Sequence, residues 1–261
     1  MLNGKSREPA ELRVPIITYH SIDESGSVIS TARDVFARQI STLANAGYAA
    51  ITLRELVSRM NNRSSLPERA VVLTFDDGFK NFYSEAFPIL NDHGYRATVF
   101  LVTDFCGKHN DWAGNPPKLP RSEILKWSEV RELSGNGVEF GSHTKTHPDL
   151  TRTSAAVLED EILNSKSALD DALGTETVSF AYPFGRMSEA TRAVVADNFK
   201  AAVSTVLGKV TPRSDLFELE RVDAYYLSDQ RILDRIETPL FDNYMRVRQI
   251  LRKAKSFAAK V

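Results

Sequence analysis

Cysteine is almost absent from this sequence of 261 residues, because Cys106 is the only one. A single cysteine excludes an internal disulfide and a zinc site built from four thiolates. Any metal must therefore be bound by histidines and carboxylates. An excess of one sign of charge is absent as well, since 33 lysines and arginines nearly balance 34 aspartates and glutamates. The net charge of -1 offers no general attraction for phosphate backbones, and we expect no nucleic-acid partner.

Long apolar runs are also absent. Residues 1–13 lack the apolar stretch that a secretory signal requires, and no segment is apolar over the length that spans a bilayer. We therefore expect a cytoplasmic location, although a leader removed from the chain would leave the same sequence.

What the sequence does contain is ordinary globular material, with 42% hydrophobic and 26% charged residues. Its length suits one large domain, and short β-branched runs alternate with amphipathic stretches, which predicts an α/β fold with a parallel sheet or barrel. The predicted strands cover residues 14–19, 48–51, 70–75, 97–102, 137–140, 178–181, 201–204 and 219–222. The predicted helices cover residues 34–46, 79–93, 154–173 and 188–197.

Two segments depart from this alternation. Residues 104–121 form a long loop, rich in glycine and proline around Trp112, of the kind that often lies over a binding site. Residues 241–261 are predicted as a basic amphipathic helix that belongs to the same domain as residues 1–240. A last helix with a solvated basic face is the simpler interpretation, and peripheral contact with an anionic membrane is the alternative.

Two adjacent carboxylates, Asp76 and Asp77, follow the predicted strand 70–75 and precede Gly78. The C-terminal ends of parallel strands are where α/β proteins build their sites, and a turn at Gly78 could bring both carboxylates to one cavity. Asp-Asp-Gly is also ordinary turn chemistry. The pair therefore predicts a site only together with other groups.

Two of the five histidines, His143 and His147, lie immediately beyond another predicted strand. Pro148 disfavours a helix at His147, so the pair is expected in a loop. Two neutral imidazoles and one carboxylate leave an open position on Zn²⁺, where water becomes acidic enough for hydrolysis. Two surface histidines in a threonine-rich loop are the alternative.

Together these motifs resemble the polysaccharide deacetylases of carbohydrate esterase family 4. The likeness rests on Thr-Phe-Asp-Asp-Gly at 74–78, His-Thr-Lys-Thr-His at 143–147 and the segment 180–185, and it extends over about residues 14–223. The resemblance implies a distorted, incomplete (β/α)7-type barrel that acts on N-acetylated saccharides. It also implies a divalent metal, Zn²⁺ or alternatively Co²⁺ or Ni²⁺, on Asp77, His143 and His147, with Asp76 as catalytic base.

One family motif departs from the pattern, because Phe180 occupies the position of an arginine. The resemblance assigns the backbone N–H of Phe184 a share in the oxyanion hole, which any residue except proline can provide. The missing arginine would orient and charge the base. We expect Arg221 to replace it, in preference to Arg186.

The family's last motif ends in a histidine late in the chain, but this chain has none after His147. His20 instead closes the first predicted strand, in the same local setting. We infer a circularly permuted motif order, since the first and last strands of a barrel are neighbours. His20 would then protonate the leaving amine, as in the subgroup that deacetylates poly-N-acetylglucosamine-type polysaccharides.

The predicted function is therefore metal-dependent removal of N-acetyl groups from an amino sugar or from a polysaccharide that contains N-acetylglucosamine. Tyr182, Pro183 and Trp112 are the predicted substrate contacts. A deformylase or deacylase of a lipid-linked or small amino sugar, and a non-catalytic saccharide-binding relative, remain alternatives. The sequence leaves the oligomeric state open.

Overall fold

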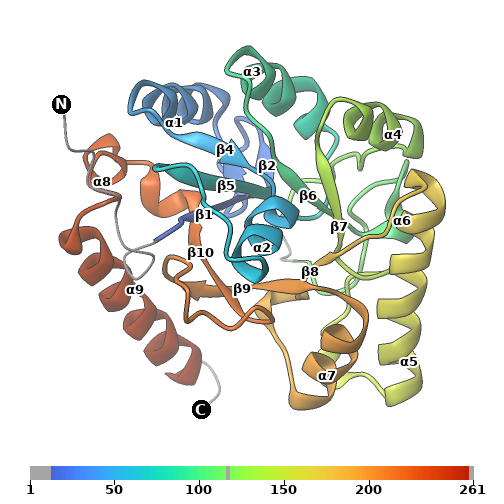
Figure 1. Ribbon diagram of the computed structural model, residues 1–261. Helices are drawn as coiled ribbons and strands as arrows, with labels where there is room; N and C mark the ends of the chain where they lie inside the picture. The colour runs from blue at the N-terminus through green and yellow to red at the C-terminus, as the bar shows by residue number, and fades with distance from the viewer. Residues whose placement is uncertain (1–12, 116–117, 259–261) are drawn as a thin grey trace.

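The computed structural model describes residues 13–115 and 118–258. Its centre is a closed barrel of parallel strands in the order β1-β10-β9-β8-β7-β6-β5, and pairing between β1 and β5 completes the ring (Figure 1). The predicted (β/α)7-type barrel is therefore confirmed. The ring strands are β1 Ile16–Tyr19, β5 Ala70–Phe75, β6 Thr98–Leu101, β7 Glu139–Ser142, β8 Ser179–Ala181, β9 Ala201–Leu207 and β10 Leu219–Asp223.

A further strand, β4 (Ala49–Ile51), pairs with the first half of β5, while β6 pairs with the end of β5. Strands β2 (Ser21–Ile22) and β3 (Ser30–Thr31) form a small separate pair. All eight predicted strands are present, with small shifts at their ends. Every residue of β5 is buried, as expected for a parallel strand covered on both faces.

Helices surround the barrel (Figure 1). Several begin where a side chain caps the first turn: Ser154 and Ser188 each accept a hydrogen bond from a backbone N–H of the helix that follows. The helices are α1 Arg33–Asn45, α2 Leu53–Asn61, α3 Phe87–Asp92, α4 Trp127–Gly135, α5 Ala155–Glu159, α6 Ser165–Leu173, α7 Glu189–Asn198, α8 Gln230–Leu233 and α9 Pro239–Ala258. The sequence did not predict α2 and α4, and the predicted helix 154–173 is interrupted by a π-helical turn, Asp160–Asn164.

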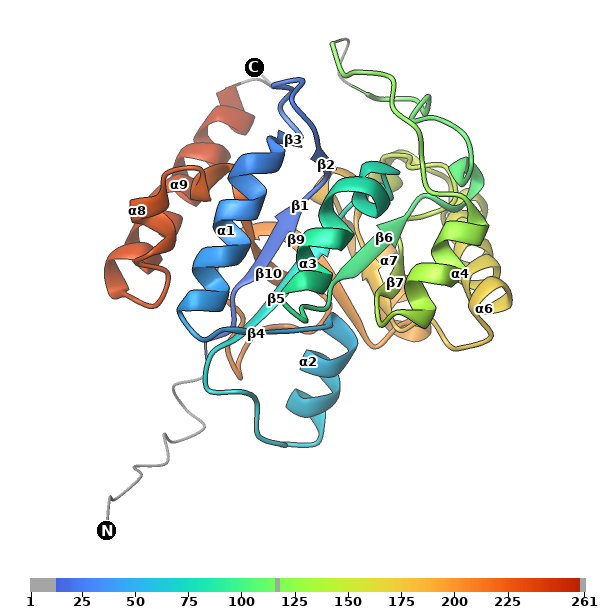
Figure 2. The ribbon, with the colours of Figure 1, turned by 90° about the horizontal axis from the view of Figure 1, so that it is seen from above.

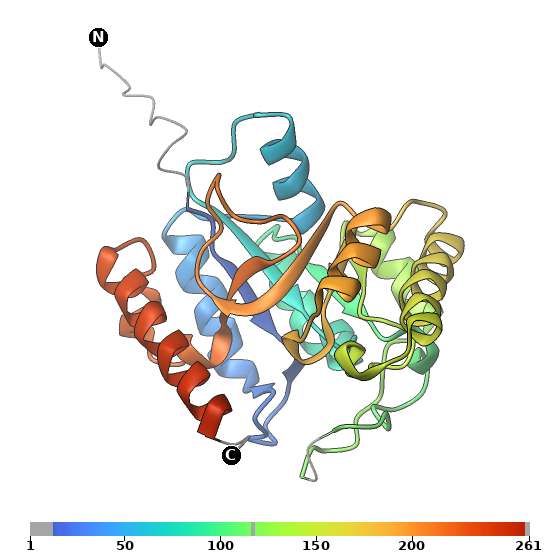
Figure 3. The same ribbon diagram turned by 90° about the horizontal axis from the view of Figure 1, so that it is seen from below.

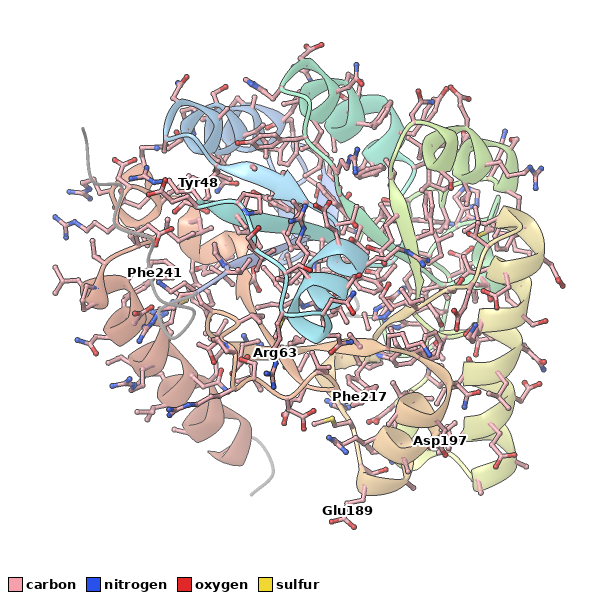
Figure 4. The ribbon with its side chains drawn as sticks, viewed as in Figure 1. Tyr48, Arg63, Glu189, Asp197, Phe217 and Phe241 are labelled. Atoms are coloured by element: carbon pink, nitrogen blue, oxygen red, sulfur yellow. The ribbon has the colours of Figure 1, made fainter. Side chains whose placement is uncertain are left out.

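The C-terminal helix α9 packs on the outside of the barrel. Phe241, labelled in Figure 4, and Met245 are buried in a core cluster shared with strand residues such as Val222. The buried Lys209 binds Asp242 at 2.8 Å and so holds the start of α9. No helix in the described ranges is long and apolar enough to cross a membrane. The cytoplasmic location and the domain boundary at residue 240 stay predictions.

Candidate metal centre and active site

The adjacent carboxylates Asp76 and Asp77 lie at the C-terminal end of β5, and an unusual backbone turns both inward. Asp77 and Gly78 both have φ of +72°, a left-handed conformation that costs a residue with a Cβ about 1–3 kcal/mol. Gly78 has a second reason to be glycine, because a Cβ there would lie 2.4 Å from Leu101 Cδ2. Both Asp side chains are almost fully buried. The turn thus gives the two carboxylates different neighbours in one place.

Asp77 faces the two histidines of the loop after β7. The Nε2 atoms of His143 and His147 both lie 3.5 Å from Asp77 Oδ1. One ligand atom from each residue can be chosen so that all three lie within 4.8 Å of one another. His143 Nδ1 is 2.8 Å from the carbonyl oxygen of Ala181, and donating its hydrogen there would leave the lone pair of Nε2 for a metal.

The pKa values of Asp77 and His147 are also consistent with the binding of a metal cation between them. Burial raises the pKa of the Asp77 carboxyl, and burial followed by the nearby His143 lowers the pKa of His147 well below its usual range. Metal ligation needs a neutral imidazole and an ionised carboxylate. A cation would supply the positive charge that the buried Asp77 lacks. Asp77, His143 and His147 therefore form a potential divalent-metal site, as the sequence predicted.

The loop that carries the histidines is held by a carboxylate that sequence reasoning missed. Glu161 accepts hydrogen bonds from the backbone N–H groups of Lys145 and Thr146, at 2.9 and 2.7 Å. Inside the loop, His147 N–H donates to Thr144 Oγ1 at 3.0 Å. Glu161 lies in the π-helical turn, a local irregularity that often marks functional sites. Its position as an acid on the buried side of a predicted helix was the available signal.

The second carboxylate, Asp76, is bound by Arg221 of β10. The Arg221 guanidinium donates from Nη1 to Oδ1 and from Nη2 to Oδ2, both at 2.7 Å, and both side chains are buried. Burial alone would raise the pKa of Asp76, but the charge and hydrogen bonds of Arg221 outweigh it and hold the pKa well below its usual range. Asp76 is therefore ionised, and it is not a member of the metal triad.

Arg221 reaches Asp76 across the intervening strand β1. Its Nη1 also donates to Thr18 Oγ1 at 2.9 Å, and its Nε donates to the carbonyl oxygen of Ser204 at 2.8 Å. The alternative arginine, Arg186, instead pairs with Asp149 at 2.6 Å on the surface. The structure thus places Arg221, rather than Arg186, beside Asp76. The family position at Phe180 is a fully buried core residue.

His20 follows β1 and lies close to Asp76. Its Nε2 lies 3.9 Å from Asp76 Oδ2, and its side chain is partly exposed. Strand β1 lies between β10 and β5, so this N-terminal histidine reaches the site because the first strand closes the ring. That position fits the permuted motif order, and the permutation itself stays a prediction.

Two aromatic rings pack against His147 of the metal triad. The Trp112 ring lies 5.2 Å from the His147 ring, and the Phe184 ring lies 4.6 Å from it. Trp112 is buried and joins the long loop to Phe79 and Phe105, whereas Phe184 remains partly exposed. Phe184 has φ of +57°, another left-handed residue at this site. Trp112 therefore anchors the loop beside the triad.

Tyr182 and Pro183 are placed differently from the prediction. Both are buried, and the Tyr182 hydroxyl donates to the carbonyl oxygen of Phe217 at 3.0 Å. The Tyr182 ring packs with Phe180 in a core cluster. Such burial does not support a substrate contact by either side chain. The spacing of the motif located this turn, but not the direction of its side chains.

Comparison with known proteins identifies the family. Residues 63–200, more than half of the chain, match the family model described as "Polysaccharide deacetylase", and the chain belongs to this family. It is 28% identical over 220 residues, 84% of this chain and 73% of the relative, to the Bacillus subtilis protein named "Putative polysaccharide deacetylase YxkH". It is 25% identical over 203 residues, 74% of this chain and 67% of the relative, to the poly-beta-1,6-N-acetyl-D-glucosamine N-deacetylase of Staphylococcus aureus MSSA476.

Solved structures agree with this assignment. The Streptococcus pyogenes deacetylase PplD, solved in complex with acetate, superposes with a TM-score of 0.72 at 28% identity, over 82% of this chain and 92% of that chain. IcaB from Ammonifex degensii superposes with a TM-score of 0.74 at 22% identity, over 87% and 97% of the two chains, which shows the shared fold. The protein is thus a hydrolase of the polysaccharide deacetylase class.

Proposed function

We propose that this enzyme removes acetyl groups from the nitrogen of N-acetylglucosamine units in a polysaccharide, with a divalent cation on Asp77, His143 and His147. The observation that carries the proposal is the second carboxylate: Asp76 is buried, ionised, and held by Arg221 beside the triad without belonging to it. The poly-N-acetylglucosamine deacetylase activity in the name of the Staphylococcus aureus relative supports the choice of substrate.

Asp76 is suited to act as the base. A cation bound at the triad would polarise the reacting oxygens and lower the pKa of water. Arg221 fixes both carboxylate oxygens of Asp76, so the base is oriented before substrate arrives. It takes a proton from the attacking water, whose oxygen forms a bond to the acyl carbon.

The remaining groups complete the hydrolysis. The backbone N–H of Phe184 stabilises negative charge on the acyl oxygen. His20 protonates the amide nitrogen as the carbon–nitrogen bond breaks, which releases acetate and the free amine. His20 suits the role of acid because its Nε2 lies 3.9 Å from Asp76 Oδ2 and its side chain is more exposed than that of Asp76.

The test measures acetate released from N-acetylglucosamine oligomers by metal-stripped protein, before and after addition of Zn²⁺, Co²⁺ or Ni²⁺. We expect metal to restore release in the wild type. Asp76→Asn should bind metal and remain inactive, and equal activity in that variant would rule out Asp76 as the base. His20→Ala should lose most activity, whereas His93→Ala, at an exposed histidine, is the control.

The alternatives give different results. Metal binding without acetate release would direct the search to formylated or lipid-linked amino sugars. Saccharide binding without metal and without product would contradict the proposal.

A further inference from the structure

Helix α9 carries a second apolar stripe, on the side that does not face the barrel. Its inner side is already buried through Phe241 and Met245. Its outer stripe exposes four large side chains: Leu240 64%, Val247 54%, Ile250 61% and Leu251 56%. A surface helix normally has one apolar stripe, which faces the core. Within the part of the chain that the structure describes, this second stripe has no partner.

The outer stripe is continuous along the helix. Val247, Ile250, Leu251 and Ala254 follow the spacing i, i+3, i+4 and i+7, which places them on one face, and all four are exposed. Scattered single apolar residues on a surface need no explanation, but a clustered patch usually marks an interaction site. The outer stripe is therefore a candidate docking surface.

Beyond its first turn, the charge carried by α9 has one sign. From Asn243 to Val261 the sequence contains six bases and no acid. Arg246 is exposed next to Val247, and Arg248 lies over the ring of Tyr226 with 4.7 Å between its guanidinium carbon and the ring centre. The one acid of α9, Asp242 in the first turn, is already paired with Lys209 and Arg13. A partner must therefore be both apolar and anionic.

We propose that the outer stripe of α9 docks on an anionic lipid surface, with the helix lying in the interface. Apolar side chains flanked by arginines and lysines are the composition of helices that bind this way. A second copy of the chain fits less well, because two α9 helices placed face to face would bring like charges together with no acid beyond the first turn to pair them.

Such docking would also fix how the candidate active site is placed relative to the membrane. Figures 2 and 3 view the molecule from above and from below, and both show the C-terminal end of α9 at the end of the barrel where the long loop after β6 lies. The carboxylates and histidines follow the C-terminal ends of β5 and β7, at this same end. A protein held through α9 would thus lie with one side of the barrel against the lipid surface, and with this end of the barrel beside the C-terminal end of the helix.

The test is sedimentation of the full chain with vesicles of phosphatidylcholine alone, or of phosphatidylcholine with phosphatidylglycerol. We expect binding that requires phosphatidylglycerol and weakens with salt. The double variant Val247→Glu/Ile250→Glu should lower the partition coefficient at least about tenfold, since it places two acids in the interface. Arg246→Glu should lower it by a smaller factor. The control is Val157→Glu, at an exposed valine of α5.

The variants should fold like the wild type, because the substituted side chains are exposed. Circular dichroism of each variant checks that the fold is intact. Absence of binding to either vesicle would overturn the proposal. So would equal binding to both vesicles, or equal loss of binding in Val157→Glu. A dimer in light scattering that dissociates in Val247→Glu/Ile250→Glu, without vesicle binding, would show that a second copy covers the outer stripe and would also overturn it.

Discussion

The buried ion pair between Asp76 and Arg221 is the residue-level feature on which the proposed chemistry depends most. Two hydrogen bonds of 2.7 Å join the groups, and both side chains are buried. Removing one partner of such a pair leaves an uncompensated buried charge. Arg221→Met should therefore lower the free energy of unfolding by about 3–5 kcal/mol, measured by urea denaturation. Arg186→Met, at an exposed ion pair, should change it by about 1 kcal/mol or less.

The same pair predicts a pH dependence. The pKa of Asp76 is lowered in the folded protein, so its stabilising effect is present above the unfolded pKa of about 4 and is lost as the pH falls below that value. Arg221→Lys keeps the positive charge but cannot donate to both carboxylate oxygens of Asp76 as the guanidinium does. It should shift the acid limb of kcat/KM to higher pH and lower kcat at least about tenfold. An unchanged profile would show that Arg221 does not control the ionisation of Asp76.

Cys106 is only partly buried, and its ionisation offers an independent test of its surroundings. Its pKa is raised to about 12, first by burial and then by Asp104, so almost no thiolate exists near neutral pH. A thiol reagent should therefore label native protein at pH 8 about a thousand times more slowly than protein in denaturant. Because the folded pKa is raised, the folded state loses stability as the pH rises above the unfolded value of about 8.5. Rapid stoichiometric labelling of native protein would contradict this.

At the level of elements, the metal loop depends on the π-helical turn that contains Glu161. This carboxylate binds two successive backbone N–H groups between the histidines and also accepts the Thr146 hydroxyl. Glu161→Gln replaces one acceptor oxygen with a donor and should lower the affinity for Zn²⁺ about 10- to 100-fold, measured by competition with a chelator. Glu159→Gln, at an exposed position of α5, is the matched control.

An unchanged zinc affinity would show that the loop keeps its shape without Glu161. Lower stability of metal-free protein with unchanged affinity would indicate a structural role alone. If Glu161 positions the loop, the Glu161→Gln substitution must lower the affinity for Zn²⁺ by more than the loss of stability of the metal-free protein accounts for.

The sequence predicted the strands well because short buried runs alternate with longer amphipathic stretches along the chain, and the run Ala70–Phe75 is buried throughout. It missed α2 and α4, whose nine residues each are too short for periodicity to distinguish them firmly from loop. It also missed Glu161, because the bonds of this residue run to a loop whose position only the folded chain defines. Motif spacing located the backbone of Tyr182 but not its buried ring, since core packing decides side-chain direction.

For the whole molecule, closure of the barrel assembles the catalytic pair. Arg221, Thr18 and Asp76 come from or directly follow three neighbouring strands, β10, β1 and β5, and the Arg221 guanidinium bridges all three. Arg221 and Asp76 lie 145 positions apart in the chain. The expectation that the first and last strands are neighbours allowed the sequence to indicate His20, whereas Arg221 was chosen as the replacement for the arginine missing at Phe180. Their contacts depend on the register in which the ring closes.

Substitutions in the C-terminal helix can show whether the whole molecule unfolds as one unit. Phe241 of α9 is buried in the same core cluster as residues of β1, β5 and β6, whereas its neighbour Leu240 is exposed. Phe241→Ala should lower the free energy of unfolding by about 3–5 kcal/mol, because it removes a buried ring and leaves a cavity. Leu240→Ala should change it by less than about 0.5 kcal/mol.

Urea unfolding followed by tryptophan fluorescence and by circular dichroism gives the decisive comparison. Both tryptophans lie outside α9, while circular dichroism also detects the helix itself. If α9 belongs to the same domain as the barrel, the two signals must change together in the wild type, and the Phe241→Ala substitution must shift both to the same lower urea concentration. An early loss of helical signal with unchanged fluorescence would instead show that α9 unfolds separately, and the predicted single domain would then be wrong.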